Sequence, residues 1–292
     1  MSDVSALASG KGHHDENFPV ASFLIHPRHR PIILAFYRFA RAADDVADHP
    51  TAGVSERLAL LQSMENGLID GTEAVAEASE LRSALASRSL PPRHALDLLE
   101  AFRRDVTKSR YTSWDELMDY CRYSAMPVGR FVLDVHGESE ATWPLSDNLC
   151  AALQIINHLQ DCGRDYRLLD RVYIPLDYLE EAGLSPDILK HFLAPAALKD
   201  VIRKLAQRTA GLLAGSRMFC HQIRDGRLAA EVAIIQALAE DLNLRLMERD
   251  PLSDRVHHSK AEMLGIALRA ASRFAVGRAR IKSHPSSFAR RP

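Results

Sequence analysis

The amino-acid sequence predicts a single domain built only of α-helices. Apolar side chains recur with a period near 3.6 along most of the 292 residues, which is the spacing of one helix face. Glycine and proline are sparse at 14 each, and no stretch alternates apolar and polar residues as a half-buried strand does. A chain of this length with 47% hydrophobic residues can bury one large core.

The domain is expected to span residues 13–282, between two flexible ends. Residues 1–12 are small and polar, which is typical of a loosely attached terminus. Residues 283–292 combine proline, serine and arginine, and we expect them to form a basic, solvated tail.

The first half of the domain is expected to contain four helices. The first contains residues 37–48 as well as Ile32, Ile33 and Phe36 on its apolar faces, and it should stop at His49–Pro50, because proline disfavours helical geometry in the residue before it. Three packing helices joined by short polar turns are then predicted at residues 55–66, 74–87 and 92–104.

The second half is expected to begin with an interrupted helix. It starts near Thr112 or Ser113, and Pro127 with Gly129 predicts a kink between residues 124 and 129. A helix follows after Pro144, and residues 170–175 form an exit loop or short strand-like link. The last helices are predicted at residues 195–216, 228–247 and 260–279.

Charge and composition exclude several functions. Lysine and arginine total 37 against 38 aspartates and glutamates, so the net charge of −1 gives no general attraction to nucleic acid. The four cysteines are widely spaced and are expected to be reduced packing residues. No apolar run reaches the ~18 residues that span a bilayer, and we expect no signal sequence, because the first residues show no basic and apolar pattern. We expect a cytoplasmic protein, with contact at the inner membrane surface at most transient.

Acidic residues repeat at helical spacing inside two apolar helices. Asp44 and Asp48 share a face with Tyr37 and Arg41, while the other faces of that helix are apolar and should be buried. A second polar stripe, far away in the sequence, consists of Gln154, Asn157, His158, Asp161 and Asp165. One such acidic pair alone is usually a solvated helix face, whereas two pairs in apolar helices predict a buried cluster that needs a cation.

Magnesium is the natural cation for this pattern. It prefers oxygen ligands and commonly bridges carboxylates to substrate phosphates, so an enzyme acting on a diphosphate substrate is indicated. A di-iron site would need glutamates and Glu-x-x-His pairs, and we interpret His158 as a hydrogen-bonded interior or rim residue. The chain has no GxxxxGK[ST], GxGxxG, HExxH or GxSxG motif, so nucleotide hydrolysis, dinucleotide-dependent redox chemistry and these hydrolases find no support.

Three segments resemble the squalene and phytoene synthase family of head-to-head isoprenoid synthases. They are FYRFARAADDVAD, YCRYSAMPVGR, and NHLQDCGRD with RVYIP after it, and the resemblance covers residues 14–280. It implies a single-domain isoprenoid synthase helical bundle with a central apolar cavity. It also implies magnesium ions held against the diphosphate by Asp44, Asp48, Asn157, Asp161 and Asp165.

The resemblance assigns further roles around the diphosphate. Tyr37 and Arg41 would contact it, and Arg171 and Tyr173 would close over its end. Tyr120 would lie over the reacting carbons and orient or exchange a proton with the leaving group. The remaining substrate-binding residues would be His14, Asn17, Ser124, Val128 and Gln154.

Several positions depart from the condensing members of the family. The basic residue of an HxKSF-like entrance is missing, since Glu16 and Asn17 stand there, and the usual arginine before the second motif is Gln160. Ser124 begins SAM where VAG is common, and Arg164 replaces a glutamate. These departures favour an enzyme that handles one diphosphate and one water.

The segments ENFPVASFLI and SAMPVGR resemble more narrowly the hydroxysqualene synthases of bacterial hopanoid pathways, which convert presqualene diphosphate and water to hydroxysqualene and diphosphate. For such an enzyme no NADPH is expected, and the product would pass to other enzymes of the squalene pathway. Two alternatives stay open: a condensing squalene or phytoene synthase, and a prenyl-lipid binding protein without catalysis.

Overall fold

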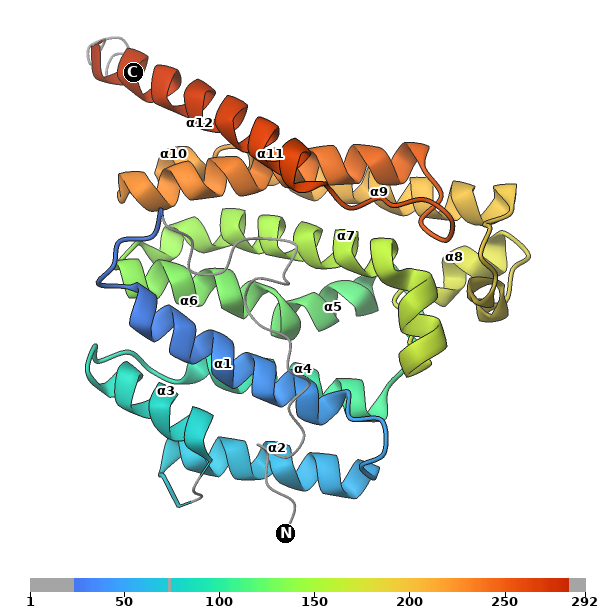
Figure 1. Ribbon diagram of the computed structural model, residues 1–292, viewed down its shortest axis with the longest axis horizontal. Coiled ribbons are helices and arrows are strands. Elements are labelled where there is room, and N and C mark those ends of the chain that lie inside the picture. Colours follow the sequence, from blue (N-terminus) through green and yellow to red (C-terminus); the bar gives the residue numbers. More distant parts are fainter. Residues whose placement is uncertain (1–23, 73–74, 284–292) are drawn as a thin grey trace, which may run out of the picture.

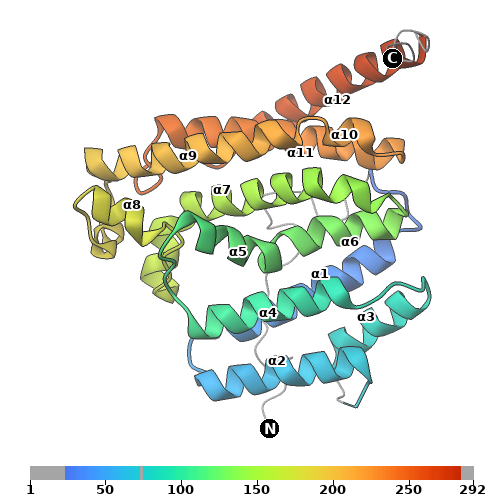
Figure 2. The ribbon, with the colours of Figure 1, turned by 180° about the vertical axis from the view of Figure 1, so that it is seen from behind.

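The computed structural model describes residues 24–72 and 75–283 and shows an all-helical bundle (Figures 1 and 2). Its helices are α1 (Arg30–Ala47), α2 (Val54–Ile69), α3 (Ala76–Ala86), α4 (Arg93–Thr107), α5 (Trp114–Ser124), α6 (Met126–His136), η2 (Glu140–Thr142), α7 (Trp143–Leu169), α8 (Leu176–Glu181), η3 (Pro186–Lys190), α9 (Ala196–Ser216), α10 (Phe219–Gln222), α11 (Gly226–Glu248) and α12 (Lys260–Ser283). The all-α prediction is confirmed. The predicted flexible start, and the predicted basic tail beyond residue 283, lie outside the described residues.

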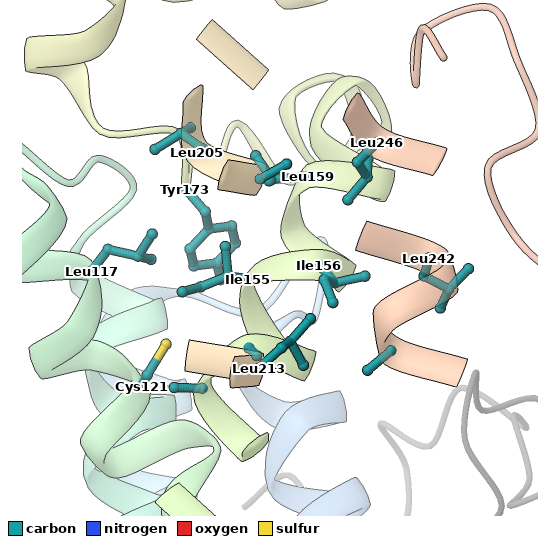
Figure 3. Packing of buried hydrophobic residues seen from close by; sticks show 14 of the residues in the cluster. Leu117, Cys121, Ile155, Ile156, Leu159, Tyr173, Leu205, Leu213, Leu242 and Leu246 are labelled. Atoms are coloured by element: carbon teal, nitrogen blue, oxygen red, sulfur yellow. The ribbon is translucent and has the colours of Figure 1, made fainter. Parts of the chain in front are cut away.

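The helices stack in layers around α7, the longest helix of the described part of the chain (Figure 1). One hydrophobic cluster contains residues of α1, α2, α3 and α4, together with Phe131 of α6. A second contains residues of α5, α7, α9 and α11. Figure 3 shows part of the second cluster. Its labelled side chains are Leu117, Cys121, Ile155, Ile156, Leu159, Tyr173, Leu205, Leu213, Leu242 and Leu246.

The predicted interruption at Pro127 is a full break between two helices. Ser113 caps α5 by accepting the backbone N–H of Glu116 at 3.3 Å, and α5 ends at Ser124. The next helix then begins at Met126, with Pro127 in its first turn, where a missing N–H costs nothing. The break leaves Ser124 and Val128 at the meeting point of α5 and α6.

Long helices agree with the predictions to within a few residues, whereas α8 and α10 were not predicted. They contain six and four residues, too few to display an apolar period. The link at residues 170–175 does pair like a strand, because Val172 bridges Arg110 in parallel and its N–H donates to the Ser109 carbonyl at 2.9 Å.

Gly129 allows α6 to pack closely on α7. A Cβ atom at this position would lie 2.6 Å from Cys150 Sγ and closer still to Ser146 Oγ. Gly129→Val is therefore expected to lower the free energy of unfolding by about 1–3 kcal/mol, the usual cost of overpacking. Urea denaturation measures the loss. Gly211→Val in α9 is the control, since a Cβ atom there would meet no other atom within 4 Å; equal stability of the two variants would contradict the close approach.

Within the described residues, no helix combines the length and the apolar character needed to cross a membrane. The four cysteines are free thiols, of which Cys121, Cys162 and Cys220 are buried. The prediction of unpaired packing cysteines is confirmed.

Candidate active site

Two adjoining cavities lie between α1, α5, α6 and α7. The larger, of about 340 Å³, is lined mainly by apolar side chains that include Phe36, Phe131, Leu149, Val232 and Ile235. Of the predicted substrate-binding residues, this apolar cavity is also lined by Tyr37, Ser124, Val128, Gln154 and Asn157.

The second cavity, of about 280 Å³, is polar. Its acidic residues come from three helices: Asp44 and Asp48 from the end of α1, Asp105 from α4 and Asp165 from α7. The other polar residues that line it are Tyr120, Ser124, Gln154, His158, Arg171 and Tyr173. Because Ser124 and Gln154 line both cavities, the polar cavity opens next to the apolar one.

Some predicted residues take other positions. Asp161 does not line the polar cavity; its Oδ1 lies 3.8 Å from Nε2 of His257, and burial together with the neighbouring Asp165 raises its pKa. Asn157 faces the apolar cavity. The predicted contacts of His14 and Asn17 fall outside the described residues.

The carboxylates of α1 carry more negative charge than their neighbours neutralise. Burial and the adjacent Asp48 raise the pKa of Asp44 to about 7, although Arg41 Nη1 donates to Asp44 at 2.8 Å and opposes this shift. Arg41 also binds Asp45 at 2.7 Å. Burying ionisable carboxylates at such a cost favours a bound cation, and Mg²⁺ is the cation that these oxygen donors suit.

Arg171 forms the cationic wall of the polar cavity. The residue is only 7% exposed, and its guanidinium donates to Asp48 Oδ1 at 2.6 Å and to the backbone carbonyl of Asp105 at 3.0 Å. The link after α7 is thereby tied to the ends of α1 and α4. Asp48, predicted as a magnesium ligand, and Arg171, predicted to close over the diphosphate, are partners of each other in this structure.

Asp105 is a residue that sequence reasoning missed. One of its oxygens accepts the hydroxyl of Tyr120 at 2.8 Å and the other accepts the hydroxyl of Tyr173 at 3.0 Å. Burial raises the pKa of Asp105 and of both tyrosines, so the tyrosines stay protonated donors. Residues 92–104 were predicted as a packing helix, and Asp105 is a single acid just beyond that range with no acidic partner at helical spacing.

His158 is a hydrogen-bonded interior residue, as predicted. Gln154 Nε2 donates to its Nε2 at 2.9 Å, and its ring stacks on Tyr173 with 3.5 Å between the ring centroids. The Tyr173 ring, the histidine and Asp105 therefore form one rigid wall beside Tyr120.

Several known proteins are similar to this chain in sequence or in fold. The sequence is 56% identical to hydroxysqualene synthase of Zymomonas mobilis over 92% of each chain, and 54% identical to that of Rhodopseudomonas palustris over 98% of this chain and 99% of the other. A squalene synthase, HpnC, from Alicyclobacillus acidocaldarius shares the fold with a TM-score of 0.71 and 32% identity, over 86% of this chain and 93% of the other.

The family model for squalene/phytoene synthase matches residues 11–262, which include both acidic stripes and the break at Pro127. With relatives above 50% identity along nearly the whole chain, this match shows that the protein belongs to the squalene/phytoene synthase family.

Proposed function

We propose that this protein is a hydroxysqualene synthase, which ionises presqualene diphosphate, captures the rearranged cation with water and releases diphosphate. The observation that carries the proposal is the pair of cavities, one acidic and one apolar, that meet at Ser124 and Gln154. A lipid with a diphosphate head fits such a pair, with its charge in one cavity and its chains in the other. Three relatives above 50% identity bear this name.

The acidic residues would hold the head group through Mg²⁺. Asp44, Asp48 and Asp165, which line the polar cavity, would be ligands, and Asp161 and Asn157 would have to turn from His257 and from the apolar cavity to join them. The bound ions would neutralise the charge that develops on the departing diphosphate. Arg41 adds a fixed positive charge next to Asp44. Tyr37 lies one turn before Arg41 and lines the apolar cavity, where it would contact the first carbons of the lipid.

Ionisation breaks the bond between carbon and oxygen, and both electrons leave with the diphosphate. The resulting cyclopropylcarbinyl cation rearranges among apolar side chains, which keep bulk water away. Tyr120, whose hydroxyl is held by Asp105, would orient the leaving group and shield the cation. Arg171 and Tyr173, fixed to the same aspartate, would keep this wall in place.

Water capture needs a polar group beside the apolar cavity, and Ser124 supplies one. Its Oγ is buried, has no hydrogen-bond partner, and lies where the two cavities meet. We propose that it holds the water whose oxygen bonds to the cation while a proton is released.

Ser124→Ala is therefore expected to leave diphosphate release within about threefold of the parent, because the head-group residues are intact. The share of alcohol in the product should fall several-fold, since a cation without water loses a proton and gives a hydrocarbon with one more double bond. Quantitative gas chromatography of the products measures the ratio. An unchanged ratio would show that the water is held elsewhere.

Product analysis tests the function as a whole. The purified chain is incubated with presqualene diphosphate, and separately with farnesyl or geranylgeranyl diphosphate, each with and without Mg²⁺ and NADPH. We expect the chain to form hydroxysqualene from presqualene diphosphate and from neither of the other two substrates. This reaction should require Mg²⁺ and should not require NADPH. Condensation of farnesyl or geranylgeranyl diphosphate would instead identify a squalene or phytoene synthase, and binding without turnover a lipid-binding protein.

We further propose transient contact with the inner face of the membrane, because the substrate and product are lipids, and the contact would let the product pass to the next enzyme of the squalene pathway. The apolar side chains Leu264, Leu268 and Val276 are exposed on α12, which also carries Arg269 and Arg273. Sedimentation with anionic vesicles tests this, and a protein that stays in the supernatant at low salt would refute it.

A further inference from the structure

Two histidines and an aspartate meet at the end of the bundle where α1 starts, and none of the three lines the polar cavity described above. His29 precedes α1, His136 is the last residue of α6 and Asp225 caps the start of α11, and these three points lie at the same end of the molecule in Figure 1. One ligand atom from each lies within 4.8 Å of the other two, and the two imidazole centroids are 4.2 Å apart.

The hydrogen bonds leave one suitable atom on each residue. His136 Nδ1 lies 2.7 Å from the carbonyl of Val132, which can only accept, so the proton sits on Nδ1 and the lone pair on Nε2. Asp225 uses Oδ1 to accept two backbone N–H groups of α11, and neither of these bonds involves Oδ2. His29 is 2% exposed, yet its Nδ1 has no hydrogen-bond partner.

A buried polar atom without a partner costs stability, and a bound ion would satisfy it. Neutral imidazoles with a carboxylate are ligands that Zn²⁺ prefers, and a histidine that donates its other nitrogen to a carbonyl is the usual form of such a ligand. We propose that His29, His136 and Asp225 form a Zn²⁺ site that joins the start of α1 to α6 and α11.

The site would stabilise the walls of the apolar cavity. Ile25 lies just before His29, Phe131 belongs to α6 and Leu228 to the first turn of α11, and all three line that cavity. A metal bridge between their elements would hold these walls together. Three protein ligands leave a fourth position for water, since zinc is usually four-coordinate.

Arg28 competes with the ion. Its Nε donates to Nε2 of His29 at 2.8 Å, whereas an imidazole that binds a metal through Nδ1 keeps its proton on Nε2. If Nε2 of His29 carries a proton, it cannot accept the N–H of Arg28, so the Arg28 side chain has to turn away. Arg28 is exposed and is therefore able to do so. Arg28→Gln should therefore tighten zinc binding several-fold.

Zinc titration of the chelator-treated full chain, in competition with a chromophoric chelator, tests the site. The parent should bind one equivalent of Zn²⁺ tightly and gain thermal stability. His136→Gln and Asp225→Asn should bind at least about 10-fold more weakly, since even the loss of a residue behind a ligand has an effect of that size. Asparagine caps a helix as well as aspartate does, so the second variant keeps the start of α11.

Two controls separate this site from others. His191→Gln removes an exposed imidazole and should bind zinc as the parent does. Asp161→Asn alters the acidic residues assigned to Mg²⁺ and should also keep the zinc equivalent, so the outcome is independent of the proposed reaction. A parent that binds no zinc, or His136→Gln and Asp225→Asn variants that bind as tightly as the parent, would overturn the proposal.

Discussion

Asp44→Asn is expected to lower kcat for presqualene diphosphate by about 10³-fold, with a folded and stable protein. Asparagine keeps the size of the side chain but removes one charge from the residues assigned to Mg²⁺, and loss of one electrostatic stabiliser has effects of about this size. Steady-state release of diphosphate at saturating Mg²⁺ measures the loss. Asp200→Asn, which removes an exposed aspartate paired with Arg203, is the control and should match the parent.

Stability distinguishes this result from misfolding. Because the folded pKa of Asp44 is raised to about 7 from an ordinary value near 3.8, its ionisation opposes folding as pH rises through that window. Asparagine does not ionise, so above pH 7 without Mg²⁺ the variant should melt at or above the temperature of the parent. Activity within tenfold of the parent would contradict the assigned role.

Tyr120→Phe is expected to lower kcat about 10²-fold with little change in KM. The substitution removes the hydroxyl that donates to Asp105 but keeps the aromatic ring. Binding of the lipid should therefore be retained, while the interaction of the hydroxyl with the reacting atoms is lost. Tyr111→Phe is a matched control. Its ring contacts that of Tyr120, with 5.2 Å between the ring centroids, and its own buried hydroxyl has no partner.

Stopped assays with a range of substrate concentrations separate kcat from KM. The Tyr111 variant should retain the activity of the parent. Equal activity of both variants would remove Tyr120 from the mechanism.

The sequence predicted the long helices because each displays several turns of apolar periodicity, and it predicted the break at Pro127 because proline cannot continue a helix. It predicted the acidic helices because two aspartates four residues apart mark a helix face. It did not indicate how deep each carboxylate lies, so Asp161 beside His257 and Asp48 beside Arg171 emerge only from the packing.

Asp105 and the cluster of His29, His136 and Asp225 have no sequence signature at all. Asp105 is one acid at the end of a helix, and the cluster joins residues from three elements whose order along the chain says nothing about their distance in space. Such groups are assembled only by tertiary packing, so periodicity and motifs cannot detect them.

Alkylation of the buried free cysteines would measure how often the core of the protein opens. Burial raises the pKa of Cys121 and Cys162 to about 12 and that of Cys150 to about 11, and only thiolates react readily with alkylating reagents. Modification at neutral pH therefore requires transient exposure of the core. Because Cys150 lines the apolar cavity, its rate of alkylation would also register whether a lipid fills that space.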